Sequence, residues 1–280
     1  WRIRDGDLFA VVSTGYSSIE QDLTYDRKRI PEIISKVSGA ALKPADLVRA
    51  ASTAEGPAEV KYRANTAFST AYDMLKQLEK ITNRRKTFIY MSSGYDFNPF
   101  SEARKRYQAQ QNTRDASTDL GLTDPNGVDP SLLDNPFEER NNQFHVADLV
   151  RELAELTRQA NRANTTLYTI DPRGLTAGPD MDEQDVKVNE YQDFVRNTQD
   201  TLRVLADLTG GFAVVNQNDF VKSLKKIDAE TSDYYVLGYY SNNPDPLKRR
   251  RTVEIRVNRP GTDLTYRREY TLKPPPKAIK

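Results

Sequence analysis

The chain has 280 residues, 37% of them hydrophobic and 29% charged, which is the balance of one large or two small globular domains with long loops. Its 41 Lys and Arg residues nearly cancel 40 Asp and Glu residues, so the net charge of +1 excludes a general attraction to nucleic acid or acidic membranes. The lack of cysteine excludes disulfides, zinc–thiolate sites and cysteine nucleophiles.

The sequence predicts neither a membrane span nor a signal peptide. No run approaches the roughly 18 apolar residues that a spanning helix needs, and no signal peptide pattern is present. Because the first residue is Trp1 rather than Met, we expect a processed or fragmentary chain that can have lost an upstream address.

Short apolar runs alternate with segments of helical period up to Gly94. Residues 8–13 (LFAVVS) predict a strand, and a helix with Pro31 in its first turn follows. Residues 66–82 carry apolar side chains every three or four positions and predict a second helix. Residues 87–93 (TFIYMSS) then predict a buried strand.

This alternation lapses between residues 96 and 143, where Pro, Asn, Asp and Gln replace apolar residues. Such a tract predicts an insertion or mobile loop, with one short helix around 101–110. Helical period resumes at His145, and 166–171 (TLYTID) predicts the next strand. His145 is the only histidine, and we interpret it as a cap or surface residue rather than a catalytic base.

A second insertion is predicted at 173–188, before the strand–helix pattern continues. A helix over 191–208 ends at Gly210 and Gly211, which are typical of a helix C-terminus. A strand at 212–216 and a short helix capped by Asp219 complete this part.

The pattern changes near residue 231. Strands at 234–240, 252–257 and 266–272 have no helices between them and predict an antiparallel extension over 231–272, followed by an extended tail at 273–280.

Two features of this extension allow a choice of interpretation. The basic run Lys248–Arg251 is interpreted as a solvated turn rather than a phosphate-binding patch, because no aromatic residues interleave it. Strand alternation divides the tyrosines of 234–240 (YYVLGYY) between two faces. Burial of both faces is the favoured interpretation, and an exposed surface for a protein partner is the alternative.

Alternating strands and helices over residues 1–230 predict an α/β domain whose mostly parallel sheet is covered by helices on both faces. The loops that follow parallel strands share the carboxyl rim of the sheet, where ligands of open α/β sheets bind. We therefore expect a binding rim formed by Ser13, Gly15, Gly94, Asp171 and Arg173.

Six segments carry a resemblance to a known family. They are DGDLFAVV (5–12), LTYDR (23–27), RRKTFIYMSSG (84–94), ANRANTTLYTIDPRGL (160–175), LADLTGG (205–211) and YYVLGYY (234–240). No single segment is specific, but the ordered set, which covers roughly residues 5–272 apart from the two insertions, resembles bacterial VWFA-related proteins with a von Willebrand factor A-like (vWA) domain.

The resemblance implies a Rossmann-type, six-stranded, mainly parallel sheet with a metal-ion-dependent adhesion site at its carboxyl rim. In the family this site takes an Asp-x-Ser-x-Ser loop after the first strand, a Thr from a later loop and an Asp after the fourth strand, which suit Mg²⁺ or Ca²⁺. Here that first loop is absent, because residues 8–13 already match the family's second strand. Loss of a central strand is expected to unpair its two neighbours.

The remaining metal ligands are also altered, so the resemblance implies a degenerate site. Ser93 stands where a metal-binding member has Asp before Gly, and Asp96 is a candidate to compensate for it. Thr66 is either the threonine ligand or the cap of the helix predicted at 66–82. Asp171 either orders the site or only shapes the turn that follows it.

These features favour a non-enzymatic module for protein binding or adhesion, since phosphate-loop, dinucleotide-loop and nucleophile-elbow motifs are absent. The resemblance implies a secreted, periplasmic or cell-surface location and an unidentified protein partner. One alternative is a Mg²⁺-dependent hydrolase, in which Asp96 and Asp171 converge to within about 4–5 Å of a shared ion. Another is a scaffold domain whose C-terminal strands dock neighbouring domains.

Overall fold

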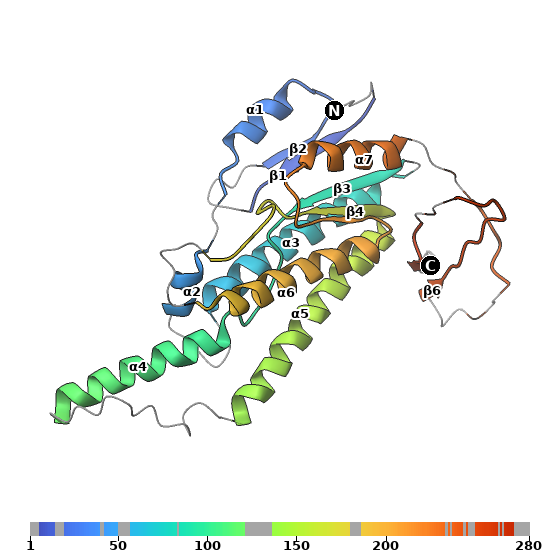
Figure 1. The fold of residues 1–280 in the computed structure, drawn as a ribbon. Helices are drawn as coiled ribbons and strands as arrows, with labels where there is room; N and C mark the ends of the chain where they lie inside the picture. Colours follow the sequence, from blue (N-terminus) through green and yellow to red (C-terminus); the bar gives the residue numbers. More distant parts are fainter. Residues whose placement is uncertain are drawn as a thin grey trace, which may run out of the picture.

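The computed structural model shows a mixed α/β fold (Figure 1). Its centre is a three-stranded parallel sheet of β3 (Lys86–Met91), β4 (Thr165–Ile170) and β5 (Ala213–Val214), in the order β3–β4–β5. The residues described are 6–14, 20–39, 42–49, 57–82, 84–120, 136–179, 186–232, 235, 237–242, 245, 250–262, 264 and 266–271.

The middle strand, β4, is the most deeply buried. It pairs with β3 over six residues, from Lys86↔Thr165 to Met91↔Ile170, and with β5 over two. All six β4 side chains are buried, because strands flank both of its edges and helices cover both of its faces. These three strands lie where the sequence predicted them.

Helices enclose the sheet on both faces (Figure 1). On the face of Leu167, one apolar core joins the sheet to α3 (Ala58–Lys80), α5 (Pro136–Arg162) and α6 (Val188–Asp207). On the opposite face, α7 (Phe220–Ser232) packs against Tyr168 and Ile170. Neighbouring residues of β4 therefore face different helices, as the two-residue period of a strand requires.

The first predicted strand is present but belongs to a separate sheet. β1 (Phe9–Val12) pairs antiparallel with β2 (Glu20–Thr24), and α1 (Arg29–Lys36) follows. Within the described ranges, β1 and β3 share no sheet, so β1 does not extend the parallel sheet as expected. All four apolar side chains of β1 are only half-buried.

Much of the predicted insertion at 96–143 is helical, which corrects the expectation of a loop. α4 spans Ser101–Leu120, well beyond the short helix expected around 101–110. α5 begins at Pro136, so His145 lies inside this helix rather than at its start. α4 projects away from the sheet, whereas the C-terminal half of α5 packs into the main core (Figure 1). A helix that projects in this way needs no strong apolar period.

The base of α4 is held by a second small core. Leu47 and Val48 of α2 (Pro44–Arg49) pack against Phe100 and Ala103 at the start of α4. Arg106 adds a bidentate ion pair to Glu190 of α6, with N–O distances of 2.7 and 2.8 Å. This ion pair connects α4, whose length the sequence did not predict, to α6.

α3 is longer than predicted, because it begins at Ala58 rather than near residue 66. Its other end is closed by Lys86, the buried first residue of β3. Lys86 Nζ donates to the carbonyl oxygens of Leu78 (2.9 Å) and Ile81 (2.8 Å). Carbonyls in the last turn have no partner within a helix, so this ammonium satisfies them and complements the negative end of the helix dipole.

The described residues of the C-terminal segment contain less sheet than predicted. β6 (Arg250–Thr252) and β7 (Glu269–Thr271) pair antiparallel over three residues, which confirms the type of pairing but not the full predicted strands. Tyr235 is 97% exposed and Tyr240 is 99% exposed, so the expected burial of the tyrosine run is wrong for these residues. Tyr234 and the tail at 273–280 lie outside the described residues.

Candidate functional site

The carboxyl rim of the parallel sheet is the candidate site. β3 and β4 run parallel and end at Met91 and Ile170, so the loops that begin at Ser92 and Asp171 emerge side by side. α6 lies across them, and its Thr198 contacts both loops through a hydrogen bond from Arg173 and a close approach to Gly94.

Asp171 is the buried anchor of the rim. Its side chain has 0% exposure, and its backbone N–H extends the sheet by donating to the carbonyl of Val214 (2.9 Å). Oδ1 accepts from Arg173 N (3.0 Å) and Nε (2.9 Å), and Oδ2 accepts from Arg173 Nη2 (2.9 Å) and Gln199 Nε2 (3.1 Å). A carboxylate has about four acceptor sites, so protein donors already use all of them.

Arg173 places a fixed positive charge against this carboxylate. Besides the ion pair, its Nη2 donates to the carbonyl oxygen of Ser93 (2.7 Å) and to Thr198 Oγ1 (2.9 Å). Its Cζ lies 5.9 Å from the ring centroid of Phe194, within the range of a cation–π contact. The guanidinium thus joins the loop that follows β3 (the β3 loop), the loop that follows β4 (the β4 loop) and α6.

Gly94 is required by the same arrangement. Its φ of 82° is left-handed, and a Cβ at this position would lie 2.0 Å from the carbonyl oxygen of Thr198. Only glycine lets the β3 loop approach α6 this closely. The Gly94 N–H donates to Ser92 Oγ (3.1 Å), which fixes the turn.

The three predicted metal ligands share no hydrogen-bond partner among the residues that the structure describes. Thr66 lies inside α3, where its hydroxyl donates to the carbonyl of Tyr62 (2.9 Å), so it is not the cap of that helix. Ser93 offers its carbonyl oxygen to Arg173, and its side chain is exposed. Asp96 accepts from the N–H of Asn98 (3.0 Å) instead of sharing a partner with Asp171.

Asp96 has an environment of its own. Burial raises the pKa of its carboxyl, while the hydrogen bonds from Asn98 and Asn197 and the nearby charge of Arg104 oppose that rise. Across the described part of the chain, no three His, Asp or Glu side chains gather into a group that could hold a metal ion.

The residues predicted to form the binding rim differ in where the structure places them. Gly94, Asp171 and Arg173 lie together, as predicted. Ser13 follows β1 in the separate antiparallel sheet, so strand pairing does not place it on this rim. Gly15 lies outside the described residues.

The sequence did not single out Thr198 and Gln199, which α6 supplies to the rim. Both are buried, in a helix whose inward positions include Val195 and Leu202. The available signal was their polarity at positions where the helical period predicts apolar residues. Buried polar side chains need partners, and the rim provides them.

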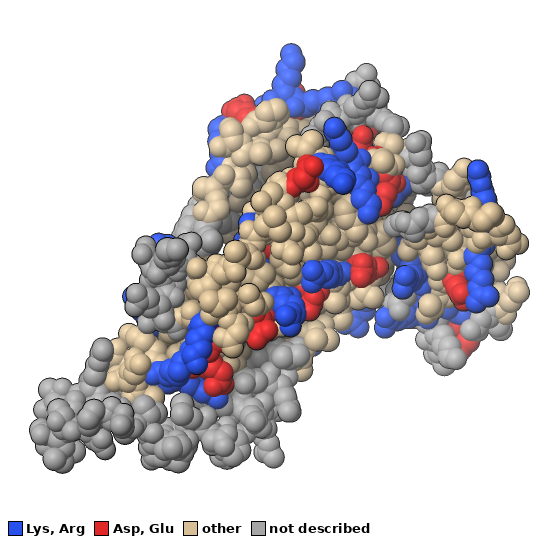
Figure 2. All heavy atoms as spheres, in the orientation of Figure 1, with Lys and Arg blue, Asp and Glu red and all other residues tan. Residues whose placement is uncertain are grey.

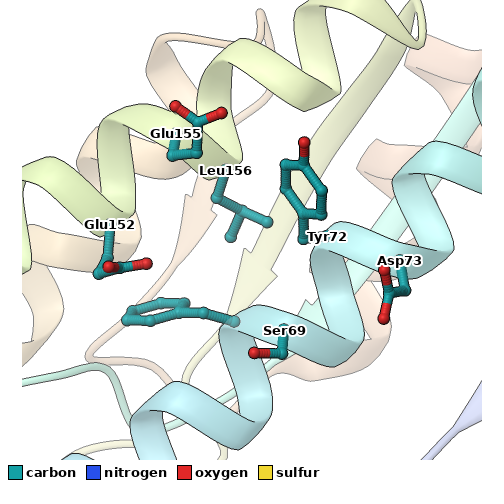
Figure 3. A pocket seen from close by; sticks show the side chains of 7 residues that line it. Ser69, Tyr72, Asp73, Glu152, Glu155 and Leu156 are labelled. Carbon is teal, nitrogen blue, oxygen red and sulfur yellow. The ribbon is translucent and has the colours of Figure 1, made fainter.

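A hollow of about 390 Å³ lies between α3 and α5 (Figure 3). Phe68 and Leu156 form its apolar base, and carboxylates border it. One of these, Glu155, is paired with Arg158 at 3.0 Å on the exposed side of α5. The lining residues are Phe68, Ser69, Tyr72, Asp73, Glu152, Glu155 and Leu156.

No family model, curated protein or solved structure matches the chain. In addition, none of the helices formed by described residues is long and apolar enough to cross a bilayer. The functional conclusion therefore depends on the chemistry of the rim.

Proposed function

We propose that the chain is a non-enzymatic, vWA-like binding module that engages a protein partner at the carboxyl rim without a metal ion. The supporting observation is the ion pair of Asp171 and Arg173. An oxygen-ligated cation needs free carboxylate oxygens, and those of Asp171 already accept from Arg173 and Gln199. In this proposal, the guanidinium supplies the positive charge that a bound metal would otherwise supply.

The hydrolase alternative requires a larger rearrangement. Asp171 would have to release Arg173, and Asp96 would have to give up its bond from Asn98, before both could ligate one Mg²⁺. The released guanidinium would then lose a bidentate pair in a largely buried place, which is costly. The extracytoplasmic location implied by the family resemblance forms part of the proposal.

A second candidate function is docking by the C-terminal segment. Four large side chains between residues 235 and 240 are 61–99% exposed: Tyr235, Leu237, Tyr239 and Tyr240. Exposed clusters of this kind are typical of protein-interaction surfaces. This observation favours the scaffold alternative, in which the segment joins neighbouring domains.

Calorimetric titration with Mg²⁺ and with Mn²⁺ tests the proposal. We expect no saturable heat with the chain as it stands. Asp171→Asn serves as the matched control, because it removes a carboxylate charge from the rim. Saturable binding that disappears in Asp171→Asn would show a metal site at the rim and overturn the metal-free proposal.

Hydrolysis of para-nitrophenyl phosphate, with and without Mg²⁺, tests the enzymatic alternative. We expect no turnover above the buffer rate. Metal-dependent turnover that Asp96→Asn abolishes would instead support the hydrolase.

A further inference from the structure

We propose that Arg173 binds a carboxylate of the protein partner, from an exposed Asp or Glu side chain, through its Nη1 nitrogen. This inference rests on the proposed function and names the chemical group that the rim recognises. It depends on how the five N–H donors of one guanidinium are distributed.

Two of the three nitrogens of Arg173 are committed to the rim. Nε donates to both oxygens of Asp171, and Nη2 donates to Asp171, Ser93 and Thr198. Nη1 has no hydrogen-bond partner among the residues that the structure describes, although it carries two N–H donors. The side chain as a whole is 19% exposed.

The guanidinium is held in place before any partner arrives. Asp171 fixes one edge of it, and Gln199 in turn holds Asp171. Thr198, which accepts from Nη2, donates its own hydroxyl proton to the carbonyl of Val195 (2.9 Å). A side chain that is already ordered loses little conformational entropy on binding, so the free edge is preorganised for an acceptor.

The surrounding charge favours a single carboxylate over a polyanion. Asp171 compensates the charge of Arg173, and Arg104 lies near Asp96. Figure 2 shows Lys and Arg atoms interspersed with Asp and Glu atoms along α6, without a continuous basic patch on that face. Nucleic acid and other polyanions need several phosphate contacts to bind well, whereas one guanidinium edge suits one carboxylate.

The first experiment uses two small probes and the unmodified, ¹⁵N-labelled chain. N-acetyl-glutamic acid α-amide carries one side-chain carboxylate, and N-acetyl-glutamine α-amide is its neutral isostere. We expect the acid alone to give saturable amide shifts centred on Gly94, Arg173 and Thr198, with a Kd on the order of 10 mM for so small a ligand. Inorganic phosphate should bind no more tightly than the acid.

Equal shifts from both probes, or shifts that do not saturate, would overturn the inference without any variant. Tighter binding of phosphate than of the acid would also overturn it, because a phosphate site would then be present.

Variants then locate the contact. Arg173→Lys keeps the charge but loses the planar fork, and we expect at least about tenfold weaker binding. The double variant Asp171→Asn with Arg173→Gln removes both charges and avoids a lone buried carboxylate, and it should show no binding. Arg196→Gln is the matched control, since Arg196 is on α6 but lies in an exposed pair with Asp193 at 3.8 Å.

The two proposals can fail separately. If the control loses binding as much as Arg173→Lys does, or if the folded double variant still binds the acid, Arg173 is not the recognition group. If no metal binds and no carboxylate binds, the metal-free rim stands but this inference falls. If Mg²⁺ binds at Asp171, the proposed function itself is wrong.

Discussion

Two strand-like runs in this chain have opposite environments. β4, with the sequence TTLYTI, has all six side chains buried. The run at 234–240, YYVLGYY, is more aromatic, yet Tyr235 and Tyr240 are 97% and 99% exposed. Composition alone would predict the reverse order of burial. The difference shows that neighbours on both edges and both faces, rather than the run itself, decide which strand becomes the core.

The same contrast separates a rigid site from an exposed surface. The rim at the end of β4 is fixed because hydrogen bonds of Asp171 and Arg173 join the loop after β4 to the loop after β3 and to α6. In the C-terminal segment, Tyr239 and Tyr270 meet through their hydroxyls at 2.8 Å, on an exposed part of the molecule. Substitutions at the rim should therefore lower the free energy of unfolding strongly. Substitutions in the C-terminal segment should change it very little.

The largest effect is expected for Asp171→Ala. It leaves the guanidinium of Arg173 without its counter-ion in a place where the carboxylate has 0% exposure, so the free energy of unfolding should fall by about 3–5 kcal/mol. Urea denaturation measures this change. Asp200→Ala, which breaks the exposed pair with Arg203, is the control and should cost much less. Similar losses in the two variants would remove the basis for calling the rim rigid.

Gly94→Ala should cause the second-largest loss of stability. The added Cβ would lie 2.0 Å from the carbonyl oxygen of Thr198, and the φ of 82° is unfavourable for alanine. Strain and displacement together should cost roughly 2–4 kcal/mol, again measured by urea denaturation. Gly178→Ala is the matched control, because a Cβ there meets nothing within 4 Å. If both variants are equally stable, α6 does not approach the β3 loop as described.

Glu190→Gln should have a smaller, pH-dependent effect. The hydrogen bonds from Arg106 are the main reason why the pKa of Glu190 lies below its ordinary value of 4.5. Because the pKa is lower in the folded chain than in the unfolded chain, the pair stabilises above pH 4.5, and this contribution is lost as the pH falls through the lowered value. We expect a loss of about 1 kcal/mol at pH 7 and less in high salt, since the pair is partly exposed.

Thermal unfolding at several pH values measures this contribution. Glu155→Gln is the control, because Glu155 forms an exposed pair with Arg158 within α5. A loss for Glu190→Gln that does not shrink toward low pH would contradict the assigned ion pair.

The smallest effect is expected for Tyr240→Ala. The side chain is 99% exposed, so its removal should change the Tm by no more than about 1 °C. Tyr168→Ala, at a fully buried tyrosine of β4, should instead cost about 3 kcal/mol or more. A large loss at Tyr240 would mean that the C-terminal run is covered in solution, which would narrow the contrast between the two runs.

Much of the sheet could be predicted from the sequence, because its strands are short apolar runs bounded by Gly, Asp or Asn. The positions of Gly94, Asp171 and Arg173 at the rim followed from that pattern. Their partnership could not be predicted, since it depends on Thr198 and Gln199, which belong to a helix that starts after a polar tract. Periodicity marks the inward face of that helix but not the depth at which it crosses the loops.

The failures of prediction have related physical causes. The length of α4 was underestimated, because a helix that projects from the body of the protein needs few apolar residues. The tyrosine run was expected to be buried because its composition is that of an inner strand, although covering it requires partners distant in the sequence. The separate β1–β2 pair shows the same dependence, since its apolar strand is only half-buried.

Lys86 has a consequence for the order of folding. Its ammonium joins the first residue of β3 to the last turn of α3, over a separation of only five to eight residues. Contacts between residues so close in sequence cost little loop-closure entropy, so they can form before distant pairings such as Lys86 with Thr165. We expect the α3–β3 unit to be an early template onto which β4, and with it the rim, is added.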